Sequence, residues 1–228
     1  MTLLLFGLFF LFMLLGVPIA FAIGASTLYA LYQSGVPLMV VTQQMFQGIN
    51  SFALVAIPMF ILAGDLMAQG KVSERLVSFA DSLVGFMRGG LSVVSVMAGM
   101  FFAAISGSGA ATTAAVGSSL VPELKRKGYD PASAASLIAA SGTIGVVIPP
   151  SVPMIIYAVI AQQSVSELFL NGFLPGLAMG VALMAIAITQ AYKRQYPKGT
   201  PLSLATMWHT FKAASWGLMT PVIILGGI

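Results

Sequence analysis

The sequence has very little charge. Only 7% of its 228 residues are Asp, Glu, Lys or Arg, 58% are hydrophobic, and the mean hydropathy is +0.99. A soluble domain carries about 25% charged residues, so this chain lacks the charge that a water-facing surface requires. The composition excludes an ordinary soluble enzyme, a nucleic-acid-binding protein and a disordered chain. Because the apolar stretches have the length of helices, it indicates an all-α polytopic membrane protein.

Cysteine is absent, and histidine occurs once, at position 209. The lack of cysteine excludes disulfides, thiol redox chemistry and Cys-ligated metals. A single histidine argues against a His-based metal site within the chain. The net charge of +4 does not indicate nucleic acid, because the Lys and Arg residues of a membrane protein mostly mark the loops that stay in the cytoplasm. We expect no nucleic-acid partner and no organic cofactor.

Residues 1–70 are interpreted as scaffold transmembrane helices. Residues 2–32 carry no charge and would form about 46 Å of helix, which is long for one span and short for two. The Gly16-Val17-Pro18 segment is either a kink or a tight turn, and the sequence leaves both open. Residues 36–52 are mixed and indicate an interfacial connection, whereas 53–69 form a clear span.

Asp65 is the only acidic residue that we place within a span, near the end of 53–69. A carboxylate inside a membrane is a functional candidate by default. From this position it can reach the interface or pair with a basic residue such as Lys71 or Arg75. We expect Asp65 to have a structural or orienting role.

Residues 71–88 form an amphipathic segment. Apolar side chains recur there at helical spacing, and the charged residues lie elsewhere on the helical wheel. This pattern predicts an arm helix that lies in the membrane interface, with packing on protein outside the membrane as the alternative. The apolar positions are Val72, Leu76, Phe79, Leu83 and Phe86.

Residues 89–192 are interpreted as a transport region. It contains two apolar arms around a Ser-Gly-Ser-Gly sequence in 89–124, a helix over 131–162 that prolines interrupt, and a span over 172–192 after a short helix that starts at Ser164. Gly172, Gly176 and Gly180 have the GxxxG spacing of a helix-packing face. Residues 193–228 are expected to hold a second interfacial arm and the truncated start of a second repeat, since the apolar run from Leu218 is half a span.

The basic residues decide the topology of 89–124. If this segment crossed the membrane once, the basic clusters would lie on opposite sides. If it is a re-entrant hairpin, all ten lie on one side, and the loop 162–171, without Lys or Arg, lies on the other. The positive-inside rule favours the hairpin. We expect 71–88, 125–130 and 193–212 to be cytoplasmic and 162–171 to be periplasmic.

The tip of this hairpin is predicted to be a site or a tightly packed corner, and its composition favours a site. Irregular backbone inside a membrane is tolerated only where protein buries it or a watery cavity surrounds it. The glycines of the tip let a ligand approach the backbone, and hydroxyl groups surround it. The hydroxyl-bearing residues are Ser106, Ser108, Thr112 and Thr113.

The second predicted feature is the helix break at 148–153. Pro149, Pro150 and Pro153 lack an N–H group, which leaves the carbonyls of Gly145, Val146 and Pro149 without helical partners. Such oxygens suit a hard cation, and the half-helix after the break points its positive end at the same place, where it suits an anion. The alternative is a plain proline kink whose polar groups bond to neighbours.

Three segments resemble the large membrane subunit of the tripartite ATP-independent periplasmic (TRAP) transporters: ISGSGAATTAAVG, PELKRKGYDPA and SGTIGVVIPPSVPMIIYA. AIPMFILAGDLM at 56–67, GVPIAF at 16–21 and PVIILGGI at 221–228 are similar as well. The resemblance covers the whole chain but only about the first half of the family's subunit. It implies the first half of an inverted-repeat, elevator-type transporter with a re-entrant helical hairpin and a discontinuous transmembrane helix.

The resemblance also implies the function and the partners. The expected activity is sodium-coupled uptake of an organic anion, of the sialic acid or C4-dicarboxylate type, across the bacterial inner membrane. The expected partners are a small membrane (Q) subunit, a periplasmic substrate-binding protein (the P subunit) and the lipid bilayer, and the expected coupling ion is Na⁺. Sodium is favoured over protons because no Asp, Glu or His, the usual proton-binding residues of a carrier, lies in 89–121 or 131–166.

The implied site residues come from the tip and the break. The expected sodium site comprises Ser106, Gly107, Ser108, Gly109, Gly145, Ile148 and Pro149. The expected substrate contacts are Ser108, Thr112, Thr143, Pro150 and Ser151.

Two other classes of function are weighed. An intramembrane serine hydrolase would use Ser108 as nucleophile and His209 as base, but His209 lies in a cytoplasmic amphipathic stretch and the GxSxG pattern fails at Ser106 and Ala110. A channel-like or structural membrane subunit also accommodates a broken helix, and flux measurements would separate it from a transporter. We expect a transporter subunit and not an enzyme.

Overall fold

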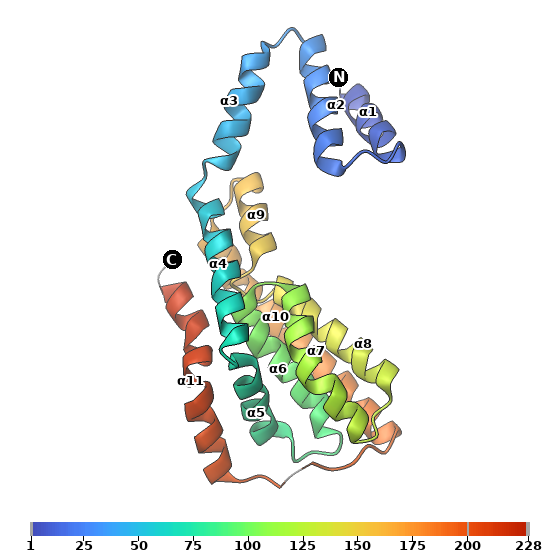
Figure 1. Cartoon of the computed structure of the whole chain (residues 1–228), viewed down its shortest axis with the longest axis vertical. Helices are drawn as coiled ribbons and strands as arrows, with labels where there is room; N and C mark the ends of the chain where they lie inside the picture. The colour runs from blue at the N-terminus through green and yellow to red at the C-terminus, as the bar shows by residue number, and fades with distance from the viewer. Residues whose placement is uncertain (1, 200, 227–228) are drawn as a thin grey trace. The chain divides into compact units, whose positions relative to one another are not determined.

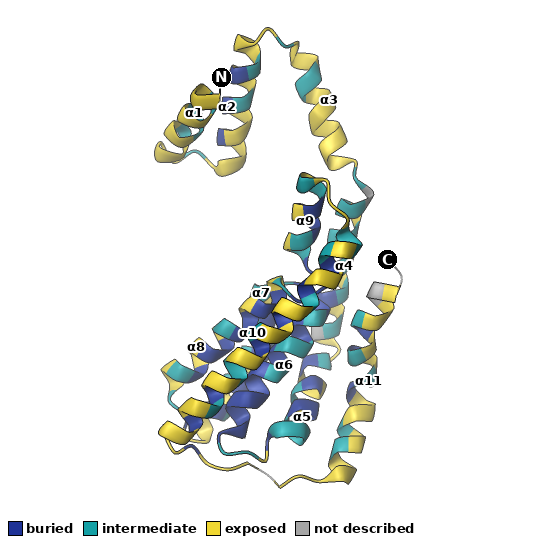
Figure 2. Ribbon diagram, turned by 180° about the vertical axis from the view of Figure 1, so that it is seen from behind, coloured by how far each residue is buried: buried dark blue, intermediate teal, exposed yellow. Residues whose placement is uncertain are grey.

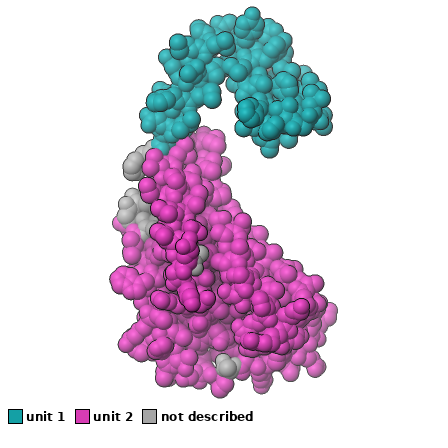
Figure 3. Space-filling view, in the orientation of Figure 1, with its two compact units in different colours: residues 1–52 teal, residues 53–228 magenta. Residues whose placement is uncertain are grey.

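The computed structural model describes residues 2–199 and 201–226, and every regular element within these ranges is a helix. The chain divides into two compact units, residues 1–52 and 53–228, which are coloured separately in Figure 3. The all-α prediction is confirmed for the described residues. Thr200, which falls within the predicted second arm, and the last two residues of the apolar run lie outside them.

The first unit contains α1 (Thr2–Leu14), α2 (Ile19–Gln33) and α3 (Leu38–Ile49). Gly16 has a left-handed φ of +79°, and α1 and α2 pack side by side, so the segment before Pro18 is a turn and not a kink (Figure 1). With 13 and 15 residues, both helices are shorter than the ~20 residues that a span requires. The segment interpreted as an interfacial connection contains a helix of its own, α3.

The second unit is built around α6, of whose 17 residues 13 are buried. Figure 2 shows buried residues gathered on and around this helix. α5, α7, α8, α10 and α11 all pack against it, because its Gly, Ala, Ser and Val side chains let neighbours approach on every side. The elements of this unit are α4 (Phe52–Gln69), α5 (Val72–Val84), α6 (Gly90–Ser106), α7 (Gly109–Arg126), α8 (Pro131–Gly142), the 3₁₀ helix η1 (Thr143–Val146), α9 (Val152–Ala161), α10 (Val165–Lys193) and α11 (Leu204–Gly226).

The arm helix α5 differs from the prediction in its length and in its apolar face. It ends at Val84, so Phe86 lies beyond it, 44% exposed. Leu76 and Phe79 are buried in a core with residues of α6, α7 and α11. The apolar stripe therefore packs on protein, as the alternative interpretation has it, and the membrane position of α5 stays a prediction.

Two predicted interruptions are absent from the described helices. The short helix at Ser164 and the span over 172–192 form the single helix α10, which the Ser164 hydroxyl caps by accepting from the Glu167 N–H at 3.3 Å. The second arm and the following apolar run are likewise continuous in α11. α10 alone among the described helices is long and apolar enough to cross a membrane, and a second candidate arises if α3 and α4 count as one interrupted span.

The linkers around Arg88, Asp130 and Arg194 meet at one end of the second unit. The Gly89 N–H donates to the Pro197 carbonyl at 3.0 Å, and the rings of Tyr129 and Tyr196 contact each other at a tilt of 33° with centroids 4.1 Å apart. Arg194 pairs with Asp130 at 2.9 Å. Since the linkers before α6 and after α7 are both at this end, 89–124 forms a helical hairpin whose tip lies at the other end (Figure 1). Whether this hairpin re-enters a membrane stays a prediction.

Candidate functional site

The hairpin tip is a two-residue turn between α6 and α7. Ser106 is the last residue of α6, and Gly107 caps that helix in the left-handed conformation with a φ of +60°. A side chain at Gly107 would also collide with the carbonyl oxygen of Pro150. This position therefore requires glycine both for its backbone conformation and for its close packing. Ser108 then caps α7, its hydroxyl accepting from the Ala111 N–H at 3.4 Å.

The helix over 131–162 breaks where the prolines predict, although the break differs in detail. α8 ends at Gly142, η1 tightens the chain through Val146, and α9 begins only at Val152. Pro153 does not contribute to the break, because it lies in the first turn of α9, where a missing N–H removes no helical bond. The Pro149–Pro150 peptide is cis.

The carbonyl of Val146 is not free, which corrects one part of the prediction. The Ser151 hydroxyl donates to it at 2.6 Å. Ser151 has no exposed surface and also caps α9 by accepting from the Met154 N–H at 3.5 Å. Ser151 therefore holds the two half-helices together across the break.

The tip and the break are in direct contact. The Val152 N–H donates to the Gly107 carbonyl at 3.3 Å, and Gly145 lies so close to Ser108 that an added Cβ would be 3.0 Å from its carbonyl oxygen. A Cβ on Gly109 would be 3.0 Å from the carbonyl oxygen of Gly142. Glycines on both segments thus allow backbone to meet backbone.

This contact brings four helix ends together. α6 and η1 end here with the negative ends of their dipoles, and α7 and α9 begin here with their positive ends. Ser108 and Ser151 have nearly the same extended backbone, with φ/ψ of −135°/124° and −130°/124°, and each caps the helix that follows. The same place therefore offers groups for a cation and for an anion.

Three oxygen atoms cluster at the tip. The Ser106 hydroxyl lies 2.9 Å from the Thr112 hydroxyl and 3.3 Å from the Ser108 carbonyl, to which Thr112 donates at 2.8 Å. Ser106 and Thr112 are buried, with 5% and 0% exposure. Oxygen atoms of this kind are the ligands that hard cations prefer, so this donor set fits a sodium ion.

Most of the expected sodium ligands lie at the tip–break contact, but not all of them. Of the seven expected sodium ligands, Ser106, Gly107, Ser108, Gly109 and Gly145 lie at the tip–break contact. The Ile148 side chain is buried in an apolar core, so only its backbone is available to an ion, and Pro149 follows it, also buried.

Only some of the expected substrate contacts have accessible side chains. Ser108 is partly exposed, and Thr143 is exposed with its hydroxyl donating to the Ala140 carbonyl at 2.7 Å. Thr112, Pro150 and Ser151 are buried within the protein. Their roles toward a substrate stay predictions.

Asp65 is closer to the tip than the sequence indicated. A cavity of about 860 Å³ is lined by residues of α4 and of the hairpin, among them Asp65, Ser106 and Ser108. The neighbouring Gly64 allows this approach, because an added Cβ would be 3.5 Å from the Ser106 Cα. In the described part of the chain Asp65 accepts from Gln69 at 3.0 Å and forms no ion pair with Lys71 or Arg75, so one of the two predicted alternatives is not found. Its position at the membrane interface stays a prediction.

The serine hydrolase interpretation finds no geometric support. The Ser108 hydroxyl serves as a helix cap, and His209 lies in α11, which begins at the end of the unit opposite the tip (Figure 1). Within the described residues, no cluster of three or more His, Asp or Glu is placed to hold a metal ion.

The family model and the individual relatives that match this chain all indicate the same family. Residues 6–228 match the DctM component of the tripartite ATP-independent periplasmic transporter. The isethionate TRAP transporter permease protein DctMQ of Oleidesulfovibrio alaskensis is 45% identical over 227 residues, which are 98% of this chain and 36% of that protein. The C4-dicarboxylate TRAP transporter large permease protein DctM of Rhodobacter capsulatus is 38% identical over 100% of this chain and 55% of that protein.

A third relative, the 2,3-diketo-L-gulonate TRAP transporter large permease protein YiaN of Escherichia coli, is 42% identical over 93% of this chain and 50% of its own length. The chain thus spans between about a third and just over half of these relatives. All three are named as permeases and none as an enzyme. The chain belongs to the DctM component family of the TRAP transporters, as its tip and break motifs indicated.

Proposed function

We propose that this chain forms the sodium-binding first half of the permease of a secondary active transporter for organic anions. The observation that carries this proposal is the contact between the tip and the break, where buried hydroxyl and carbonyl oxygens cluster beside four helix ends. Such an arrangement favours a cation and an anion at adjacent points, as ion–substrate symport requires.

In this proposal the tip and the break hold the sodium ion between them. Ser106, Ser108 and Thr112 supply oxygens from the tip, and the backbone at Gly145, Ile148 and Pro149 supplies them from the break. A bound sodium ion neutralises the negative ends of α6 and η1 and so stabilises the closed contact between the two segments. Sodium is favoured because neither segment carries an Asp, Glu or His, the side chains that usually bind the proton in a proton-coupled carrier.

The substrate anion would lie at the positive ends of α7 and α9. Ser108, which caps α7, is partly exposed, and Thr143, the first residue of η1, is exposed. The relatives are named for isethionate, C4-dicarboxylates and 2,3-diketo-L-gulonate, all of them organic anions. This supports an organic anion with a carboxylate or sulfonate group, of the C4-dicarboxylate or sialic acid type.

The proposed setting is a bacterial inner membrane, with a small Q subunit and a periplasmic substrate-binding protein as partners. One relative is named DctMQ, which supports the pairing with a Q component. The second half of the permease would complete the site from the opposite side, in an elevator-type mechanism.

The test is uptake into proteoliposomes that contain the full-length permease, its Q subunit and its periplasmic substrate-binding protein. Succinate, isethionate, 2,3-diketo-L-gulonate and N-acetylneuraminate are offered in turn under an imposed sodium gradient or an imposed proton gradient. We expect one of them to accumulate under the sodium gradient. Accumulation driven by protons in sodium-free buffer would overturn the choice of ion, and flux that no gradient can drive uphill would indicate a channel.

A further inference from the structure

The glycine face of α10 packs against the helix break. Gly172, Gly176 and Gly180 are all buried, and each lies one turn of the helix from the next. The sequence indicated a packing face without a partner. The structure supplies partners for all three glycines, and these partners differ in how easily they can move; Gly172 faces the Met154 thioether as well as the backbone.

Gly172 lies against the backbone of the break. An added Cβ would be 2.7 Å from the carbonyl oxygen of Val147, a separation that Cβ atoms essentially never show. The Val147 carbonyl belongs to the peptide that joins it to Ile148, directly before the two prolines. A methyl group on residue 172 therefore forces the break itself to shift.

Gly176 lies against the next residue of the break. An added Cβ would collide with Cγ1 of Ile148 and would be 3.5 Å from the Ile148 backbone nitrogen. Ile148 is 6% exposed and packs in the core between α6, α8 and α10. To avoid this collision, Ile148 must adopt a new rotamer, or the backbone must move by less than a methyl group on residue 172 would require.

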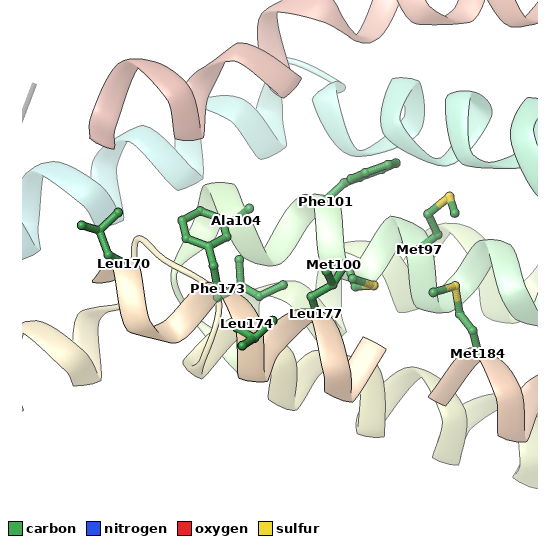
Figure 4. Close-up of a pocket in the computed structure, with 10 residues that line it drawn as sticks. Met97, Met100, Phe101, Ala104, Leu170, Phe173, Leu174, Leu177 and Met184 are labelled. Carbon is green, nitrogen blue, oxygen red and sulfur yellow. The ribbon is translucent and has the colours of Figure 1, made fainter. Parts of the chain in front are cut away.

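Gly180 provides a matched contrast on the same face. A methyl group there would meet Sδ and Cε of Met100, the far end of a flexible side chain. Met100 borders an apolar cavity of about 530 Å³ between α6 and α10, into which its thioether can move (Figure 4). The same substitution at this position leaves the break where it is.

We propose that Gly172 and Gly176 are positioning residues, which seat the backbone at 147–148 against α10 and thereby set the sodium affinity of the site. This inference rests on the proposed function. The break is held on its other side by the tip, through the Val152–Gly107 hydrogen bond and the close approach of Gly145 to Ser108. Displacing 147–148 by one methyl group moves the carbonyls of Gly145, Ile148 and Pro149 relative to the tip oxygens. The glycines themselves contact no ion.

The experiment measures the sodium concentration that gives half of the sodium-induced thermal stabilisation of the purified full complex, with choline chloride keeping the ionic strength constant. We expect Gly172→Ala to raise this midpoint by about tenfold, equivalent to ~1.4 kcal/mol and within the usual cost of overpacking. Gly176→Ala should raise it by about threefold, and Gly180→Ala should stay within about twofold of wild type. A merely structural role would lower the melting temperature in sodium-free buffer without moving the midpoint.

A rescue variant keeps the proposal testable if Gly172→Ala fails to assemble. Ile148→Ala removes the Cγ1 atom that a methyl group on residue 176 meets, so Gly176→Ala combined with Ile148→Ala should bring the midpoint back toward wild type. An unchanged midpoint in Gly172→Ala, or an equal rise in all three alanine variants, contradicts the inference. If the wild-type complex responds to choline as it does to sodium, the proposed sodium site fails instead, whatever the variants do.

Discussion

At the scale of single residues, Ser106 connects the parts of the proposed sodium site. Its hydroxyl lies within hydrogen-bonding distance of Thr112 and of the Ser108 backbone. Ser106→Ala removes that oxygen and leaves the Thr112 hydroxyl with one partner fewer. We expect the sodium concentration for half-maximal uptake to rise by about tenfold, since an interaction with a charged partner contributes about 1.5 kcal/mol or more.

A matched control for this change lies on the same hairpin. Ser118 is exposed on α7, and its hydroxyl donates only to the Ala115 carbonyl at 3.0 Å. Ser118→Ala should leave the sodium dependence unchanged, and neither variant should alter the pH dependence of uptake. A shift in the pH profile of Ser106→Ala would indicate that a proton and not sodium binds near the tip.

A substitution at Asp65 can distinguish an orienting role from a role in ion coupling. It shares a cavity with the tip serines but receives a hydrogen bond from Gln69. Asp65→Asn keeps an oxygen that can accept from Gln69 and removes the charge. If Asp65 has an orienting role, uptake should fall by no more than about threefold, a loss typical of one weakened hydrogen bond. Complete loss of uptake in a complex that still assembles would assign Asp65 to ion coupling.

At the scale of the helices, the sequence predicted interruptions well where backbone chemistry dictates them. Pro149 and Pro150 cannot donate helical hydrogen bonds, and the helix is broken around them. The Gly107 turn and the caps at Ser108 and Asp130 follow from similar local preferences. The prediction that Pro153 contributes to the break is wrong, because a proline in the first turn of a helix removes no helical hydrogen bond. The sequence did not show that α9 begins at Val152.

Contacts between helices were not predictable in the same way. Nothing in the local sequence indicates that the Ser151 hydroxyl bonds to the Val146 carbonyl, or that Gly64 brings α4 beside Ser106. The apolar face of α5 packs on α6, although its helical periodicity equally suits a lipid surface. Periodicity reports that a face is apolar, whereas its partner is decided by segments far away in the chain.

The pH dependence of stability tests the packing of α5 through Asp81. Burial raises the pKa of the Asp81 carboxyl above its ordinary value, Lys127 acts against this shift, and Glu123 adds to it. The stability that this group contributes is therefore present below the unfolded pKa, near 4, and is lost as the pH rises through the folded pKa. Asp81→Asn should raise the melting temperature of the complex at about pH 7, and the difference should vanish near pH 4.

Asp130→Asn is the control of opposite sign. Hydrogen bonds from the side chain and backbone of Ser133, and one from Arg194, lower the pKa of Asp130. Its contribution is present above the unfolded pKa and is lost as the pH falls through the folded pKa. This variant should melt slightly lower than wild type at about pH 7, because Asn keeps the helix cap but gives up the ion pair. If both variants shift the melting temperature in the same direction, the assignment of Asp81 is wrong.

At the scale of the whole molecule, three linkers that contain basic residues meet in space. The segments around Arg88, Asp130 and Arg194 join through a backbone hydrogen bond, a contact between two tyrosine rings and an ion pair. The tip and the break lie away from this end, and the loop between α9 and α10 carries no Lys or Arg. This separation is the one that a re-entrant hairpin requires, with the basic end in the cytoplasm.

The sidedness of these two ends can be measured directly, because the chain contains no cysteine. Gly128 is a poor position for a reporter, since its left-handed φ of +82° would strain any side chain. The Arg126 side chain is 77% exposed at the basic end, and Gln163 is exposed in the loop between α9 and α10. Arg126→Cys and Gln163→Cys are therefore the matched pair, one for each proposed side of the membrane.

We expect an impermeant thiol reagent added to intact cells to label the cysteine at 163 and not the one at 126. After the membrane is permeabilised, both should react, which shows that position 126 is shielded by the bilayer and not by the protein. A single crossing by residues 89–124 would place positions 71–88 and 126 on opposite sides, so Lys71→Cys provides the third reporter. Labelling of positions 71 and 126 only after permeabilisation supports the hairpin. External labelling at 126 with none at 163 contradicts it, because the hairpin would then not enter and leave the membrane from the cytoplasmic side.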